Sequence, residues 1–197
     1  MVSILAGAVP ASAQPSADSG RKQAIAVRVP SGSIRVDGRL DEDVWRQAPA
    51  IANFVQKEPV EGAQPTDLME VRFVYDDTAL YVGARMESRN GTRVQAPMGR
   101  RDSGDQAEHL LVSLDTYLDR RTAFTFGVTA SGVRLDHYHA SDTERDPSTE
   151  FDPVWEAQTT IGEHGWVAEL WLPFSQLRFN EHSPQVWGLN LNHGFRR

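Results

Sequence analysis

The feature that most constrains the fold is a two-residue alternation of apolar side chains in short segments. Val71, Phe73 and Tyr75 alternate with polar or smaller neighbours, and the alternation resumes over residues 80–86. Residues 76–78, Asp-Asp-Thr, are turn-forming types. Successive side chains of a strand point to opposite faces of a sheet, so this period is that of half-buried β-strands. The sequence therefore predicts a β-hairpin here.

Further segments with strand character follow along the chain, several of them bounded by Gly, Pro or Asp. They cover residues 108–115, 122–130, 132–139, 153–161, 165–172 and 185–193. Regularly spaced short strands with few helical stretches are typical of a β-sandwich. We predict an all-β fold, an antiparallel sandwich of jelly-roll or immunoglobulin-like type, in one domain over residues 25–197.

Two short helices are expected to interrupt the strands. Asp41 is a residue type that caps helix N-termini, so we expect a helix over residues 42–47. Leu40 before the cap and Trp45 within the helix are placed to form a hydrophobic staple, which makes Trp45 a structural residue. A second helix, of one turn, is expected at residues 175–177.

Residues 1–13 have features of an export signal. Residues 1–9 are small and apolar, and Ala11-Ser12-Ala13 is an A-x-A pattern that fits a signal peptidase. A positively charged n-region is absent, which favours a truncated signal; the alternative is an Ala-rich N-terminus with no targeting role. We expect export to the periplasm, the outer membrane or the medium, with residues 14–24 as a linker.

Composition excludes several function classes. Lys and Arg number 20 against 27 Asp and Glu, a net charge of −7, and no basic run offers phosphate contacts, so nucleic acid is not an expected partner. No apolar run reaches the roughly 18–20 residues of a membrane-spanning helix. With no cysteine, disulfides and cysteine zinc sites are excluded. The G-x-S-x-G, H-E-x-x-H and phosphate-loop patterns are missing, so we do not expect an enzyme.

Four groups of segments resemble, in order, the family 9 carbohydrate-binding modules. They are Ile34–Trp45 (IRVDGRLDEDVW), Val71–Asp77 with Leu80–Val82, Asp105–Glu108 leading to Asp115, and Gly165–Glu169 with Pro173. Residues 115–122 (DTYLDRRT) and 131–136 (SGVRLD) are similar to the variant that opens larger exported bacterial proteins, where a region resembling an outer-membrane barrel follows. By this resemblance we expect the chain to be a fragment of such a protein.

The resemblance implies a β-sandwich that binds the ends of sugar chains without cleaving them. In such sites sugar C–H groups pack on Trp or Tyr rings, while fixed polar side chains pair with hydroxyls. By spacing, one clamp tryptophan of the family falls at Asp102 here, and the second lies beyond residue 197. Of the family's ligand contacts, Glu108 and the amide at Asn192 are kept. We therefore expect weak binding of simple sugars.

Alternation places further polar candidates for ligand binding on two strands. Asn190 and Asn192 share one face of their strand, and Thr125, Gly127 and Thr129 share one face of theirs. If these strands are neighbours they form a small polar platform; the alternative is an ordinary solvated sheet face.

Trp155 is a further candidate because it follows an acidic loop and a proline. This position favours exposure at a rim, where the ring would stack on a ligand; the other four tryptophans are expected to be buried.

A carboxylate-rich loop is the candidate metal site. Asp142, Glu144 and Asp146 supply the oxygen ligands that calcium prefers, and the family resemblance implies structural calcium. The spacing departs from the D-x-[DN]-x-[DN]-G loop, so a solvated acidic loop is the alternative. His137 and His139 share one face of a strand and could supply two ligands to zinc or copper, but the sequence assigns no third ligand.

Two functions remain open. The first is a carbohydrate-binding module for oligo- or polysaccharide, serving degradation or uptake. The second is a structural domain that docks on the barrel-like region of its own parent chain and has no sugar ligand. An exposed aromatic ring beside Asn190 and Asn192 would favour the first, and a wide apolar patch near the last strand would favour the second.

Overall fold

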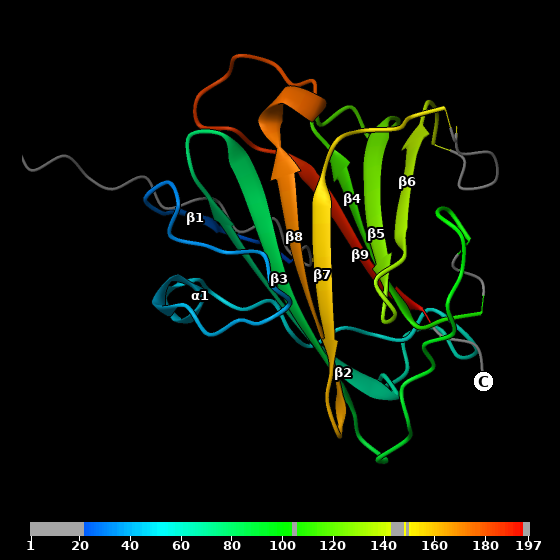
Figure 1. The fold of residues 1–197 in the computed structure, drawn as a ribbon. Helices are drawn as coiled ribbons and strands as arrows, with labels where there is room; N and C mark the ends of the chain where they lie inside the picture. The colour runs from blue at the N-terminus through cyan, green and yellow to red at the C-terminus, as the bar shows by residue number, and fades with distance from the viewer. Residues whose placement is uncertain (1–21, 104–105, 143–147, 149, 195–197) are drawn as a thin grey trace, which may run out of the picture.

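The computed structural model describes residues 22–103, 106–142, 148 and 150–194, which form two β-sheets packed face to face (Figure 1). The five-stranded sheet has the order β1-β2-β3-β8-β7 and the four-stranded sheet the order β6-β5-β4-β9. Every pairing is antiparallel except that of β1 with β2. The predicted all-β sandwich is confirmed.

The bounds of the elements agree closely with the predicted segments. The strands are β1 Ala26–Arg28, β2 Asp67–Tyr75, β3 Ala79–Ser88, β4 His109–Asp115, β5 Ala123–Thr129, β6 Arg134–His139, β7 Glu156–Ile161, β8 Gly165–Pro173 and β9 Gly188–Gly194. The helices are α1 Asp43–Gln47 and the 3₁₀ turn η1 Phe174–Gln176. The predicted export signal and residues 14–21 of the linker lie outside the described residues.

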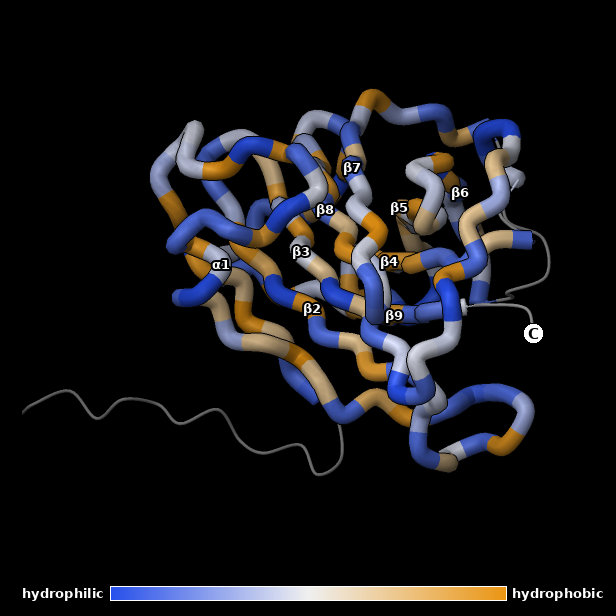
Figure 2. Tube along the Cα trace, turned by 60° about the horizontal axis from the view of Figure 1, so that its bottom comes forward, coloured by the Kyte–Doolittle hydropathy of each residue, from blue (hydrophilic) through white to orange (hydrophobic). Residues whose placement is uncertain are grey.

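The main core lies between the two sheets. Along β2 and β3 the inward positions pair in register, as Phe73 with Val82 and Val71 with Ala84, and all four are buried. In the turn between these strands, Asp76 Oδ1 accepts the N–H groups of Thr78 and Ala79. Figure 2 shows hydrophobic positions interspersed with hydrophilic ones along the strands. The alternation predicted from sequence is therefore the alternation of core and outer face.

A second, smaller core lies on the outer face of the five-stranded sheet, under α1. Trp45 is only 2% exposed there. A Cβ on Gly83 of β3 would lie 2.7 Å from Leu40 Cδ2 and 2.9 Å from Trp45 Cζ3, so both side chains cover this glycine. The structural role predicted for Trp45 is confirmed.

The predicted cap of α1 is wrong by one residue. The N-cap is Glu42 rather than Asp41, and no side chain caps the helix. The Glu42 carboxylate instead accepts the N–H of Arg35 through Oε1, at 3.1 Å, which ties the preceding loop to the helix. Among the described residues, no helix has the length and apolar character needed to span a membrane.

Candidate ligand-binding site

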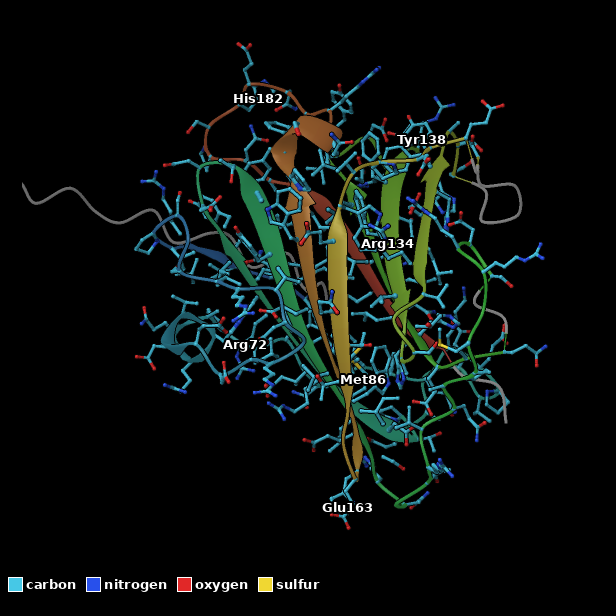
Figure 3. All side chains as sticks on the ribbon, viewed as in Figure 1. Arg72, Met86, Arg134, Tyr138, Glu163 and His182 are labelled. Carbon is cyan, nitrogen blue, oxygen red and sulfur yellow. The ribbon has the colours of Figure 1, made fainter. Side chains whose placement is uncertain are left out.

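The inner faces of the two sheets change from apolar to polar at one end of the sandwich. Asp67 and Ser88 pair across β2 and β3 one step beyond the buried pair of Met69 and Met86. On the facing sheet, His193 of β9 pairs with the buried Leu110, so it too points between the sheets. In Figure 3, Met86 lies toward the end at which the β7–β8 turn carries Glu163.

These side chains line a cavity of about 290 Å³. Polar side chains come from both sheets and from the segment between β3 and β4; they are Asp67, Ser88, Thr92, Gln95, Glu108 and His193. Met86 and Val94 supply apolar surface. A small concave site with a few convergent polar groups on an apolar base is the usual form of a small-molecule site.

Glu108 is the most firmly held group in the cavity. Its Oε1 accepts the N–H of Gln95 at 2.9 Å, and its Oε2 accepts the indole N–H of Trp166 at 3.1 Å. His193 Nε2 lies 3.7 Å from the same Oε2, within ion-pair range when the imidazole is protonated. The side chain is 12% exposed. Its orientation is therefore fixed from three directions.

The ionisation of Glu108 follows from these neighbours. Burial opposes the charged form, but His193 and the N–H groups of Gln95 and Trp166 outweigh it and hold the pKa of Glu108 below its ordinary value. The carboxylate is thus ionised at neutral pH. It offers a fixed acceptor for a ligand hydroxyl or amine.

Local sequence explains how Glu108 reaches this place. It precedes β4 by one residue and shares the inward phase of Leu110, Val112 and Leu114, all buried. Its own N–H donates to the Gln95 carbonyl at 2.8 Å. Gln95 is therefore bound to Glu108 at two points, and the segment before β4 forms a wall of the cavity.

The predicted polar platform forms on the outer face, but the two strands that carry it are separated by β4. β5 and β9 do not pair with each other; both pair with β4, which sets Asn190 opposite Ser113 and Asn192 opposite Leu111. Ser113 and Thr125 share a hydrogen bond of 2.8 Å between their hydroxyls. This face is on the other side of the four-stranded sheet from Glu108. The structure does not bring Asn190 and Asn192 together with Glu108.

Asp102 joins a loop to the outer edge of β6. Its Oδ1 accepts the N–H of Asp136 at 3.0 Å, and its own N–H donates to the Arg134 carbonyl at 3.1 Å. The residue adopts a left-handed backbone conformation, with φ at 61°. β6 and β9 are the opposite ends of the four-stranded sheet, so Asp102 lies away from the cavity that His193 lines.

Trp155 is not at a rim, contrary to the prediction. Its ring is 0% exposed and meets Phe126 edge-on, with 5.3 Å between centroids. The indole N–H donates to Asp136 Oδ1 at 3.0 Å. Trp155 shares the inward phase of Ala157 in β7, while its neighbour Val154 is exposed. The second sheet covers the ring, so it is not available for stacking on a ligand.

The metal prediction is only partly within the described residues. Asp142 is exposed, whereas Glu144 and Asp146 lie outside the described part of the chain. Within that part, no three His, Cys, Asp or Glu side chains are grouped to hold a metal ion. His137 and His139 lie on the outer face with ring centroids 5.5 Å apart. Burial, and then the neighbouring His139, lower the pKa of His137.

Among the described polar residues that line the cavity, only Glu108 was predicted from sequence; those missed include Asp67 and His193, which lie in strands. Both occupy the strand phase of apolar neighbours, Asp67 with Met69 and His193 with Leu191. A polar residue in the apolar phase at the end of a strand was the available signal, because such a residue faces the end of the core.

Similarity to known proteins is found among solved structures. No family model matches the sequence, and neither does any curated protein sequence. A family 9 carbohydrate-binding module from Caldicellulosiruptor kristjanssonii in complex with cellotriose is 15% identical, with a TM-score of 0.58 over 87% of this chain and 77% of that one. The fold is that of these modules.

Two further structures agree. The same type of module from Caldicellulosiruptor kristjanssonii in complex with glucose is 16% identical, with a TM-score of 0.58 over 86% of this chain and 78% of that one. A candidate carbohydrate-binding protein from Bacteroides uniformis is 12% identical, with a TM-score of 0.63 over 86% of this chain and 82% of that one. The fold implied by the sequence resemblance is confirmed.

Proposed function

We propose that this chain is a non-catalytic carbohydrate-binding module that takes a saccharide in the end cavity around Glu108. The observation that carries the proposal is a carboxylate that is ionised, fixed by three neighbours and set in a cavity. An acceptor held in place before binding loses little conformational freedom when a sugar hydroxyl donates to it. The modules with the same fold are in complex with cellotriose and glucose.

The size of the cavity suits one sugar ring. Its volume of about 290 Å³ is at the lower limit of small-molecule sites, roughly 300–1,000 Å³. Met86 and Val94 can pack against ring C–H groups, while Gln95, Glu108 and Ser88 can pair with hydroxyls. The ligand is therefore a single sugar, or the terminal unit of an oligo- or polysaccharide.

We expect the affinity for neutral sugars to be weak. Among the described lining residues there is no Trp, Tyr or Phe to stack on the sugar face. Truncating a central aromatic contact commonly costs 2 kcal/mol or more, about thirtyfold in affinity. Without two such rings, a micromolar site moves to the millimolar range.

Titration calorimetry with glucose, cellobiose and xylobiose tests the proposal. Glu108→Gln keeps the shape of the side chain and removes its charge, so binding should fall at least tenfold, about 1.4 kcal/mol. Asn192→Ala on the opposite face of the sheet is the control and should leave binding unchanged. Loss of binding in Asn192→Ala, with Glu108→Gln unaffected, would move the site to the outer platform and contradict the cavity.

The proposed setting is an exported protein concerned with polysaccharide degradation or uptake. The A-x-A pattern at residues 11–13 supports export. Fusion of residues 1–24 to a reporter that is active only outside the cytoplasm tests this part separately; an inactive reporter would contradict it.

A docking domain without a sugar ligand is the second candidate. Large apolar side chains are exposed beside β9, where Val186 is 63% exposed and Phe179 and Leu189 are each 37% exposed. Exposed apolar surface of this kind marks contact sites with other proteins or chain segments. A module that binds no saccharide, yet associates with the barrel-like region of its parent chain until Val186→Ser is introduced, would favour this candidate.

A further inference from the structure

The charge of the cavity is strongly one-sided. Two carboxylate side chains share the inward phase, those of Asp67 and Glu108, whereas Glu87 lines the cavity from the outward strand phase of Leu68. His193 is the one basic type among the described lining residues, which include no Lys or Arg. A concave site with one sign of charge raises the local concentration of ligands with the opposite sign.

Asp67 and Glu108 differ in how their charges are compensated. Glu108 accepts from Gln95 and Trp166 and lies beside His193. Asp67 Oδ1 is buried and has no hydrogen-bond partner among the residues that the structure describes. Buried polar atoms nearly always have a partner, and this one lies at a cavity, where a bound ligand can supply the donor. Asp67 is therefore the cavity residue best suited to receive one.

We infer that the cavity prefers an amino sugar with a free, protonated amine over a neutral sugar, and that Asp67 determines this preference. The inference rests on the proposed function. An ammonium group brings three N–H donors and a positive charge, whereas a hydroxyl brings one donor and none. Hydrogen bonds between ionised partners are roughly twice as strong as neutral ones. The ammonium group would pair with the Asp67 carboxylate while ring hydroxyls pair with Glu108.

The same chemistry disfavours an N-acetylated sugar. Its amide is neutral, carries one N–H and adds bulk in a cavity of only about 290 Å³. Asp67 gains no charge pairing from such a group, and its Oδ1 atom still lacks a strong donor. The substrate class is thus a free hexosamine or a chain that ends in one.

Titration calorimetry at mildly acidic pH, where the amine is protonated, tests the inference with glucosamine, glucose and N-acetylglucosamine. Wild-type protein should bind glucosamine roughly tenfold more tightly than glucose, and the difference should shrink with added salt. Asp67→Asn should remove the difference, so that glucosamine and glucose bind the variant with equal affinity. Asp77→Asn removes the same charge at the other end of the β2–β3 hairpin and should keep the preference.

The outcomes separate the two proposals. Equal binding of glucosamine and glucose by the wild type, or a preference that survives in Asp67→Asn, would overturn the role of Asp67 and leave the carbohydrate site standing. Absence of binding for all three sugars would overturn both. If Asp67→Asn fails to fold in thermal melts, the wild-type comparison of the three sugars still decides the preference.

Discussion

Two buried glutamates on opposite sides of the five-stranded sheet show how differently one side chain behaves in two parts of this molecule. Glu108 lies between the sheets at the end cavity, where donors and His193 keep its pKa low. Glu169 of β8 is 0% exposed on the outer face, opposite Gly83. Its Oε2 accepts the N–H groups of Asp37 and Gly38, at 2.9 and 3.1 Å, and its Oε1 has no hydrogen-bond partner in the described part of the chain.

Burial by itself favours a higher pKa for both carboxyl groups. The neighbouring groups therefore decide whether each final pKa lies above or below the ordinary value. For Glu169, burial is the main cause, and the negative charges of Glu42 and Asp37 add to it; the two N–H donors do not compensate, and the pKa rises to about 7. Glu108 instead has a potential cation beside it. Glu108 therefore stays charged at the cavity, whereas Glu169 holds a loop against the sheet.

The largest expected loss of stability comes from truncating Trp45, whose ring covers the outer face of the five-stranded sheet near Glu169. Trp45→Ala should destabilise the fold by roughly 3–5 kcal/mol, because it leaves a cavity over Gly83. Denaturant unfolding measures the change. Val44→Ala, on the same helix and less buried, is the control and should cost much less; a loss below about 1 kcal/mol in Trp45→Ala would show that the ring is not a core element.

Next in size is the pH dependence that Glu169 contributes. Its folded pKa of about 7 exceeds the ordinary 4.5, so the folded state holds the proton more tightly. The resulting stabilisation is complete below pH 4.5 and is lost as the pH rises to about 7, in total about 3 kcal/mol. Glu169→Gln should remove this decline, since its amide can accept the same two N–H groups.

Unfolding free energies measured from pH 4 to 8 check this prediction. Glu163→Gln, an exposed site on the β7–β8 turn, is the matched control and should keep the wild-type profile. A profile in Glu169→Gln that still declines between pH 4.5 and 7 would assign the titration to another group.

The ionisation of Glu108 should change the stability of the fold in the opposite direction, and over a lower pH range. Because its pKa is below the ordinary 4.5, its stabilisation is present above that pH and is lost as the pH falls through the lower folded value. Glu108→Gln should therefore lower the unfolding free energy at neutral pH and flatten its decline on the acid side, without changing its slope near pH 7. A variant whose loss of stability is confined to alkaline pH would contradict this assignment.

The smallest effect is expected at the acidic loop. Calcium that binds only the folded state would raise the melting temperature by linkage. Because the spacing of Asp142, Glu144 and Asp146 departs from known calcium loops, we expect no shift between millimolar calcium and chelator. A clear rise in melting temperature that disappears in Asp142→Asn would establish a calcium site instead.

Much of the scaffold could be predicted from the sequence because it depends on local periodicity. The alternation of Val71, Phe73 and Tyr75 defined β2, and the staple of Leu40 and Trp45 located α1. Glu108 could be named from the resemblance of its segment to the family. The order of the strands was not accessible, because pairing between distant segments depends on the whole set of sheets.

The candidate site could not be predicted without the order of the strands. Alternation indicates which side chains share a face, but not which face another sheet will cover. Asn190 and Asn192 were grouped with Glu108 by sequence, yet they lie on opposite faces of the sheet because Glu108 shares the inward phase of β4 and the two asparagines the outward phase of β9. Trp155 followed an acidic loop, yet the four-stranded sheet buries its ring against Phe126.

The sequence by itself determined the class of fold, the strand phases and the apolar positions of the core, since these follow from local hydrophobic pattern. Tertiary structure alone decided where the core ends and which polar groups meet there. Asp67 and His193 are 126 positions apart, and only the packing of the two sheets brings both to one cavity. A carboxylate acquires its charge state, and with it any use in binding, from such distant neighbours, because burial and nearby charges set its pKa.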